Sequence, residues 1–123
     1  MNLNDSRVRD VMSTPLATIS PDASLKEAAE TMRKNDLSAL VVTTGPPSIV
    51  TRSDIVGAVA DSADLTDRIV RDVMTESVET VPPDCPLGEA IAMMTNFDIE
   101  HLPVAADDYL GMVSMSDITG RLI

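Results

Sequence analysis

Two short motifs in the chain place a hydroxyl group three residues before a carboxylate. The sequence T-R-S-D runs from Thr51 to Asp54, and S-M-S-D runs from Ser114 to Asp117. In each motif an apolar run ends at the hydroxyl and a helical pattern begins near the carboxylate. A carboxylate placed there can accept hydrogen bonds from both hydroxyls of a ribose, while the hydroxyl and the N–H groups of a helix start can meet a phosphate. The two motifs are therefore candidate nucleotide-binding groups.

Both motifs also have an explanation that involves no ligand. Ser, Thr and Asp are the residues that most often cap the start of an α-helix, and one such cap is worth about 1 kcal/mol. The presence of the motif in two places does not separate the explanations, because a duplication copies caps as well as binding sites.

The other reactive side chains form no catalytic or metal-binding set. His101 is the only histidine and Cys85 the only cysteine, so an internal disulfide and a cluster of thiolate ligands are excluded. We find neither a nucleophile–base pair nor a glycine-rich phosphate loop. We therefore expect no catalytic residue, no metal and no required cofactor, and we expect Cys85 to be inert among acidic neighbours.

Charge and hydropathy limit the partners. The chain carries 20 acidic and 9 basic residues, a formal net charge of −11. Such a surface repels phosphate backbones, which argues against nucleic-acid binding. No apolar run approaches the roughly 18 residues of a membrane span, and the first residues do not resemble a signal peptide. The sequence predicts a cytoplasmic protein that binds neither nucleic acid nor membrane.

The elements that position the two motifs are duplicated. The sequence V-R-D-V-M at 8–12 recurs at 70–74, and a shift of 62 residues aligns 8–42 with 70–104, with fifteen of 35 positions identical. After one extra residue in the second copy, Ser53-Asp54-Ile55 aligns with Ser116-Asp117-Ile118. The chain is therefore a tandem repeat, which we divide at 1–62 and 63–123.

Each repeat has the pattern of a β-α-β-β-α unit. Short strands precede Pro-Asp turns, amphipathic helices follow them, and Ser24 is placed to cap the first helix. We also expect a linking helix over 66–74, with a counterpart at 6–12. The fold class is α+β, with the two repeats packed sheet to sheet about a pseudo-two-fold axis in one module. The expected strands are 16–19, 39–42, 49–51, 78–81, 102–104 and 112–114, and the expected helices start near 25, 55, 87 and 118.

The repeat resembles the cystathionine-β-synthase (CBS) domain. The resemblance covers roughly residues 6–123 and depends on the order of V-R-D-V-M, T-I-S-P-D-A-S-L, T-V-P-P-D-C-P-L, H-L-P-V and G-M-V-S-M-S-D. It implies a regulatory pair of repeats, a Bateman module, with two clefts that commonly hold AMP, ADP or ATP and sometimes S-adenosylmethionine or NAD-type molecules. It also implies a homodimer formed through the helical faces. A scaffold with degenerate clefts is the alternative, and an enzyme is the least favoured.

The resemblance implies that each cleft is shared between the repeats. Gly111, before the second motif, would let a backbone approach closely, whereas Glu100 would repel a phosphate, so we favour the cleft that contains Asp117. That cleft comprises Ser114, Ser116, Asp117, Leu16, Ala17, Thr18, Leu37, Ser38 and Ala39. The other comprises Thr51, Arg52, Ser53, Asp54, Val78, Glu79, Thr80, Ile99, Glu100 and His101, with Arg52 as a phosphate partner.

Overall fold

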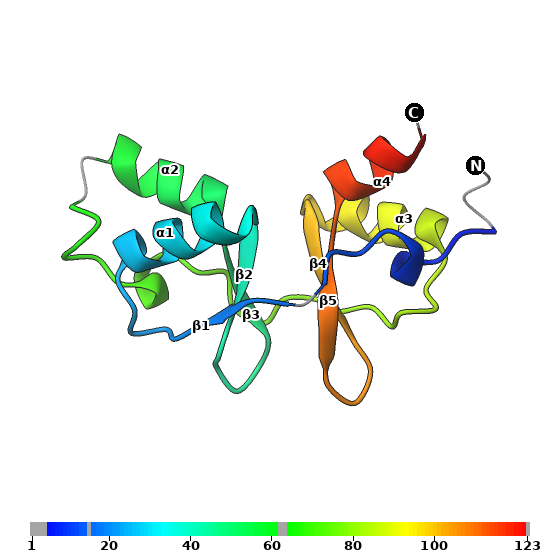
Figure 1. Cartoon of the computed structure of the whole chain (residues 1–123), viewed down its shortest axis with the longest axis horizontal. Helices are drawn as coiled ribbons and strands as arrows, with labels where there is room; N and C mark the ends of the chain where they lie inside the picture. The colour runs from blue at the N-terminus through cyan, green and yellow to red at the C-terminus, as the bar shows by residue number, and fades with distance from the viewer. Residues whose placement is uncertain (1–4, 15, 62–63, 123) are drawn as a thin grey trace. The chain divides into compact units, whose positions relative to one another are not determined.

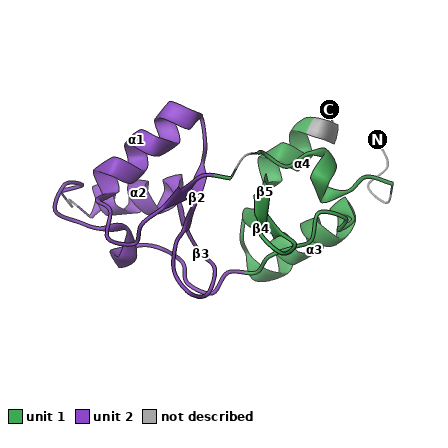
Figure 2. Cartoon of the chain, turned by 60° about the horizontal axis from the view of Figure 1, so that its bottom comes forward, with its two compact units in different colours: residues 1–16, 79–123 green, residues 17–78 purple. Residues whose placement is uncertain are grey.

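The computed structural model describes residues 5–14, 16–61 and 64–122. It divides the chain into two compact units, residues 17–78 and residues 1–16 with 79–123 (Figure 2). Each unit contains helices and strands, which confirms the α+β class. The units are described one at a time below.

The unit formed by residues 17–78 contains the first repeat in its expected order. Its elements are β1 (Thr18–Ile19), α1 (Leu25–Asn35), β2 (Ala39–Val42), β3 (Ser48–Thr51) and α2 (Arg52–Ala60), followed by the 3-10 turn η2 (Val70–Asp72). The sheet order is β1-β2-β3, in which β1 and β2 are parallel and β2 and β3 antiparallel. Helices α1 and α2 pack beside each other (Figure 1), and their apolar faces close a core that includes Leu25, Met32 and Ile55.

The other unit contains the second repeat together with the start of the chain. Its elements are the 3-10 turn η1 (Val8–Asp10), α3 (Leu87–Phe97), β4 (His101–Ala105), β5 (Tyr109–Ser114) and α4 (Met115–Leu122). Strands β4 and β5 are antiparallel, with Leu102 opposite Val113. The strand expected at 78–81 is reduced to one parallel bridge between Val81 and Val104. The described residues of this repeat therefore read α-β-β-α plus that bridge.

Local capping explains where the helices begin. The Ser24 hydroxyl accepts a hydrogen bond from the Glu27 amide at 3.0 Å, as the sequence predicts. Helices α2 and α4 each begin three residues earlier than expected, directly after the strand-end hydroxyl. The helix expected over 66–74 and its counterpart expected at 6–12 are both wrong, because only Val70–Asp72 and Val8–Asp10 are helical and both turns are of the 3-10 type.

The opening V-R-D-V-M segment of each repeat packs into the core formed by the other repeat. Val8 is fully buried in the cluster of the second repeat, where its amide donates to the Cys85 carbonyl at 2.8 Å. Val70 is fully buried in the cluster of the first repeat, where its amide donates to the Ala23 carbonyl at 2.8 Å.

This exchange explains why the compact units and the repeats divide the chain differently. The chain passes from one unit to the other between residues 16 and 17 and again between residues 78 and 79. These boundaries differ from those of the repeats because each opening segment finds its hydrogen-bond acceptors in the other repeat. The predicted division at 62/63 lies outside the described residues and stays a statement about the repeats. The predicted sheet-to-sheet packing likewise stays a prediction.

Candidate nucleotide-binding site

The first motif forms a closed corner between β3 and α2. Thr51 is both the last residue of β3 and the N-cap of α2. Its amide and its hydroxyl donate to Asp54 Oδ2 at 2.8 and 3.1 Å, and the Asp54 amide donates back to Thr51 Oγ1 at 3.3 Å. This arrangement is a capping box, so the cap that the sequence offered as an alternative is present.

The second motif forms the same corner between β5 and α4. The Ser114 amide donates to Asp117 Oδ2 at 3.0 Å, and the Asp117 amide donates to Ser114 Oγ at 3.0 Å. Ser116 adds a second hydroxyl, 3.0 Å from that of Ser114. In both corners the aspartate accepts the cap hydrogen bonds through Oδ2. The cap therefore does not require Oδ1 of Asp54 or of Asp117.

A neighbouring carbonyl completes each corner. The Arg52 amide donates to the Ser38 carbonyl at 3.0 Å, and the Met115 amide donates to the Glu100 carbonyl at 2.9 Å. In each helix two of the first three amides therefore already have acceptors within their unit. The second amide of each helix, that of Ser53 in α2 and that of Ser116 in α4, lies between the two amides whose acceptors are described above. The helix starts consequently offer a phosphate less than the sequence predicts.

The structure groups the predicted site residues within each unit. Ala39 lies opposite Thr51 in the β2–β3 register, so the 37–39 segment accompanies the Thr51–Asp54 corner. His101 lies opposite Ser114 in the β4–β5 register, so the 99–101 segment accompanies the Ser114–Asp117 corner. The predicted clefts combine residues of both units, and these combinations stay predictions. The remaining predicted site residues divide between the units. The unit 17–78 contains Ala17, Thr18 and Val78, and the other unit contains Leu16, Glu79 and Thr80.

Charge distinguishes the two corners. The Arg52 guanidinium lies 3.9 Å from the Asp36 carboxylate, and both side chains are exposed. Exposed ion pairs of this kind contribute roughly 0–1 kcal/mol. A phosphate could therefore displace Asp36, although Asp36 competes for the only cation in that motif. At the other corner Met115 stands in place of Arg52, and the exposed Glu100 lies beside it, since its carbonyl accepts from the Met115 amide. The carboxylate that the sequence analysis expected to repel a phosphate at the Asp54 cleft is therefore next to the Ser114–Asp117 corner, so charge does not favour a phosphate there.

Gly111 has a structural role that the sequence did not reveal. Ser13 and Met112 form an antiparallel bridge, with N–H···O distances of 2.8 and 3.1 Å. A Cβ atom on Gly111 would lie 2.5 Å from the Ser13 carbonyl oxygen. The backbone that approaches Gly111 closely is therefore the chain's own segment 12–14. The signal in the sequence was the contrast between Gly111 and its counterpart Ser48, a buried residue that accepts a hydrogen bond from Thr44.

Three further observations concern the thiol, metal binding and membrane insertion. Burial raises the pKa of the Cys85 thiol, the charges of Glu89 and Asp84 raise it further, and Arg7 opposes them. Among residues 5–14, 16–61 and 64–122, no three His, Cys, Asp or Glu side chains are grouped to hold a metal ion. None of the helices in these ranges is long and apolar enough to cross a bilayer.

Comparison with known proteins gives one family for both halves. The model of the CBS domain matches residues 8–61 and 70–123. The inosine-5'-monophosphate dehydrogenase of Korarchaeum cryptofilum is 35% identical in an alignment of 118 residues. That alignment covers 93% of this chain but 23% of that enzyme. An uncharacterized 17.7 kDa protein of Acidianus ambivalens is 30% identical, with 96% of this chain and 74% of that protein covered. The chain thus spans about a quarter of the enzyme and about three quarters of the smaller protein.

Solved structures share the fold. A conserved protein of Pyrococcus horikoshii superposes with a TM-score of 0.84 at 25% identity, over 99% of this chain and 95% of that one. The CBS domain pair of protein MJ0100 superposes with a TM-score of 0.82 at 27% identity, over 95% of each chain. That pair was solved in complex with 5'-methylthioadenosine and S-adenosyl-L-methionine.

Proposed function

Since the chain belongs to the CBS domain family, as its motifs predicted, we propose that it is a non-catalytic regulatory module that binds an adenosyl compound. The adenine nucleotides AMP, ADP and ATP are the ligands that we propose first, and S-adenosylmethionine or an NAD-type molecule is the alternative. Occupancy of the site would be passed to a partner as a change in shape.

One observation carries this proposal. Both units place a carboxylate and a strand-end hydroxyl in the same hydrogen-bonded corner, and only Oδ2 of each carboxylate takes part in the cap. The other oxygen of Asp54 or Asp117 can accept from ribose hydroxyls without undoing the cap. The MJ0100 pair, which has the same fold, binds two ligands that contain an adenosyl group. Ribose and adenine would therefore supply most of the recognition.

The Ser114–Asp117 corner is our first choice for the ligand. Ser114 and Ser116 provide two hydroxyls beside one carboxylate, and Ser114 is only 6% exposed, so its bonds form in a sheltered setting. At the other corner Arg52 favours a phosphate, but Asp36 already pairs with it. Since two helix-start amides at each corner are in use, we expect the phosphates to add less affinity than the ribose does.

Exposed apolar side chains support a homodimer as part of the proposal. Val56 and Val59 on α2 are 66% and 55% exposed, and Phe97 at the end of α3 is 56% exposed. Exposed large apolar side chains on helices often form the interface between two copies of a protein chain. Concentration-dependent sedimentation, with Val59→Asp as the disrupting variant, tests this part separately.

A scaffold without a ligand is the second candidate, because the caps alone account for both aspartates. A hexameric CBS-CP12 protein from cyanobacteria has this fold, with a TM-score of 0.89 at 26% identity. An enzyme is not our proposal, since the chain spans only 23–25% of the dehydrogenase and of a homoserine O-acetyltransferase of Methanohalobium evestigatum.

Titration calorimetry with AMP, ADP, ATP and S-adenosylmethionine tests the proposal. The informative variant is Asp117→Asn, because an asparagine oxygen can still accept from the Ser114 amide while the charge and the second acceptor are lost. We expect affinity to fall about tenfold or more, as charge-assisted hydrogen bonds are worth about 1.5–3 kcal/mol. Asp10→Asn is the matched control, because Asp10 makes the same cap bond, to the Arg7 amide at 2.8 Å, outside the proposed site.

Two results would contradict the proposal. One is an absence of binding to the wild-type protein for every ligand in the series. The other is binding that survives unchanged in both Asp117→Asn and Asp54→Asn. A scaffold would also keep the same oligomeric state with and without the ligands.

A further inference from the structure

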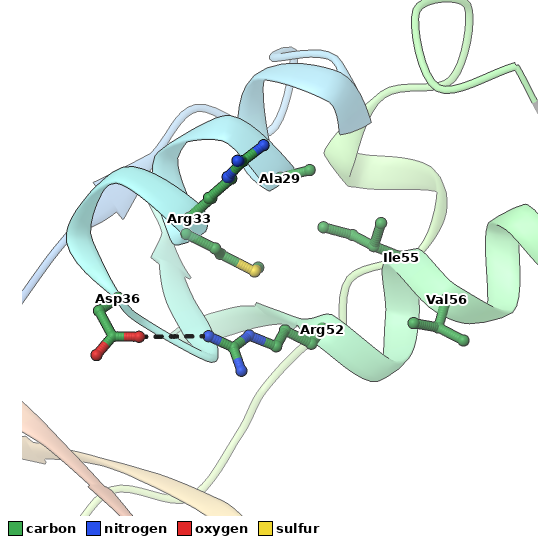
Figure 3. Close-up of a pocket in the computed structure, with 7 residues that line it drawn as sticks. Ala29, Arg33, Asp36, Arg52, Ile55 and Val56 are labelled. Carbon is green, nitrogen blue, oxygen red and sulfur yellow. Dashed lines mark ion pairs between the residues drawn. The ribbon is translucent and has the colours of Figure 1, made fainter.

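A cavity lies between α1 and α2 in the unit 17–78, beside the Thr51–Asp54 corner, with which it shares Arg52. Its volume is about 340 Å³, within the range of small-molecule sites. Figure 3 shows Ala29 and Arg33 on the α1 side and Ile55 and Val56 on the α2 side. The ion pair between Asp36 and Arg52 lies at one end (Figure 3). The lining residues are Ala29, Met32, Arg33, Asp36, Arg52, Ile55 and Val56.

The cavity combines an apolar floor with two cations. Four of its lining side chains are uncharged and apolar, whereas Arg33 and Arg52 are guanidinium groups from the two facing helices. The chain has only nine basic residues and a net charge of −11, so two arginines at one cavity are a local exception. A mainly apolar hollow with a few fixed charges is the usual form of a site for a small organic molecule.

The second repeat supplies an internal comparison for this arrangement. The alignment of the repeats places Ile91 at the position of Ala29, Thr95 at that of Arg33 and Met115 at that of Arg52. Ala29 is smaller than Ile91, and both cations are missing from the second copy. The duplicated pattern of helix starts and core residues therefore does not require a hollow with two arginines.

We propose that this cavity binds a small aliphatic carboxylate. The hydrocarbon part would lie against Ala29, Met32 and Ile55, and burying it would supply the driving force. The carboxylate would take the place of Asp36 at Arg52, since guanidinium groups match carboxylates in geometry and charge, and Arg33 would add positive charge on the α1 side (Figure 3). The site shares Arg52 with the Thr51–Asp54 corner and Val56 with the proposed dimer surface, but it shares no residue with the Ser114–Asp117 corner, so the proposal for that corner can fail or hold independently.

Asp36 acts as an internal competitor for the ligand. Its carboxylate lies 3.9 Å from Arg52 and its side chain is fully exposed, so the pair is weak and easily displaced. Removal of this charge should therefore tighten binding. The equivalent residue of the second repeat, Asp98, has the same left-handed backbone at the end of its helix but no lining role in this cavity.

The test is calorimetry of the full chain with octanoate, with octanol as the uncharged analogue. We expect saturable octanoate binding that Arg52→Met weakens about five- to tenfold and Asp36→Asn tightens about two- to fivefold. Asp98→Asn should leave it unchanged. Ala29→Ile should abolish binding, because it fills the cavity with the side chain that the second repeat carries at that position. Circular dichroism and the urea midpoint of Ala29→Ile check that the fold is retained.

Several outcomes would overturn the proposal. These are no saturable octanoate binding, equal affinity for octanol, or binding that Ala29→Ile and Arg52→Met both leave intact. If instead octanoate does not bind and Ala29→Ile changes the sedimentation of the protein, a second copy of the chain occupies the cavity and the carboxylate site is wrong.

Discussion

Replacement of Gly111 with alanine should detach the start of the chain from β5. The added Cβ would lie 2.5 Å from the Ser13 carbonyl oxygen, 3.0 Å from Thr14 Cγ2 and 3.3 Å from Met12 Sδ. A carbon cannot stay 2.5 Å from a backbone oxygen, and the atom it meets is not the end of a flexible side chain. The segment from Met12 to Thr14 must therefore move away from the strand.

The structure gives the size of the effect. Two hydrogen bonds join Ser13 and Met112, and each is worth about 1 kcal/mol net. If the displacement also loosens Val8, which is fully buried, part of the roughly 1.5–3 kcal/mol from its burial is lost as well. We expect Gly111→Ala to lower the free energy of unfolding by about 2–4 kcal/mol.

Urea denaturation measures the total, and hydrogen exchange at the Ser13 and Met112 amides locates the change. Gly57→Ala is the matched control, because Gly57 is in the middle of α2 and a Cβ there meets nothing within 4 Å. That substitution should stabilise the protein by about 0.5–1 kcal/mol, since alanine is the better helix former. If Gly111→Ala were as stable as the wild type with unchanged exchange at Ser13, the close approach would not govern docking of the segment.

Three further predictions concern the core, a helix end and the thiol. Val70→Ala should lower the free energy of unfolding by about 2 kcal/mol, because Val70 is fully buried, and hydrogen exchange should accelerate in residues 17–61 rather than in 79–122. Asp98→Gly should raise the free energy of unfolding by about 0.5–1 kcal/mol in urea denaturation, since Asp98 has φ 53° and places a negative charge at the C-terminus of α3; a lower stability would refute this account of the helix end. Because the pKa of Cys85 is raised from its ordinary value of 9.0, the folded protein keeps the thiol proton at a pH where the unfolded chain releases it. This stabilisation is complete below pH 9.0 and is lost as the pH rises through the folded pKa. Above pH 9.0 the urea midpoint should therefore fall more steeply with pH in the wild type than in Cys85→Ala, and an equal fall in both proteins would contradict the shift.

Local interactions account for what the sequence predicted correctly. Ser24 caps α1, because the Glu27 amide that it satisfies is only three residues away. The α1 helix and the hydroxyl–carboxylate hydrogen bonds of the two corners likewise depend on neighbours in the chain, so periodicity and capping patterns were enough to place them. The duplication was visible in the residues themselves, and the CBS family followed from the order of the repeated motifs.

Contacts between distant segments decided the rest. Residues 66–74 have a helical pattern, yet the Val70 and Arg71 amides donate to the carbonyls of Ala23 and Pro21, so the segment makes one 3-10 turn and no longer helix. The strand expected at 78–81 becomes a single bridge, because Val81 meets only Val104 in this way. The acceptors in both cases lie more than 20 residues away, and no local pattern reports them.

The sequence by itself determined the repeat, the family and the two corners that could hold a ribose. Only the tertiary structure showed that each V-R-D-V-M segment completes the core of the other repeat, that Gly111 makes room for Ser13, and that Ala29, Arg33 and Arg52 line one cavity. The physical reason is the range of the interactions. Caps and amphipathic faces act within a few residues, whereas burial and close backbone approach depend on which distant segment fills the space.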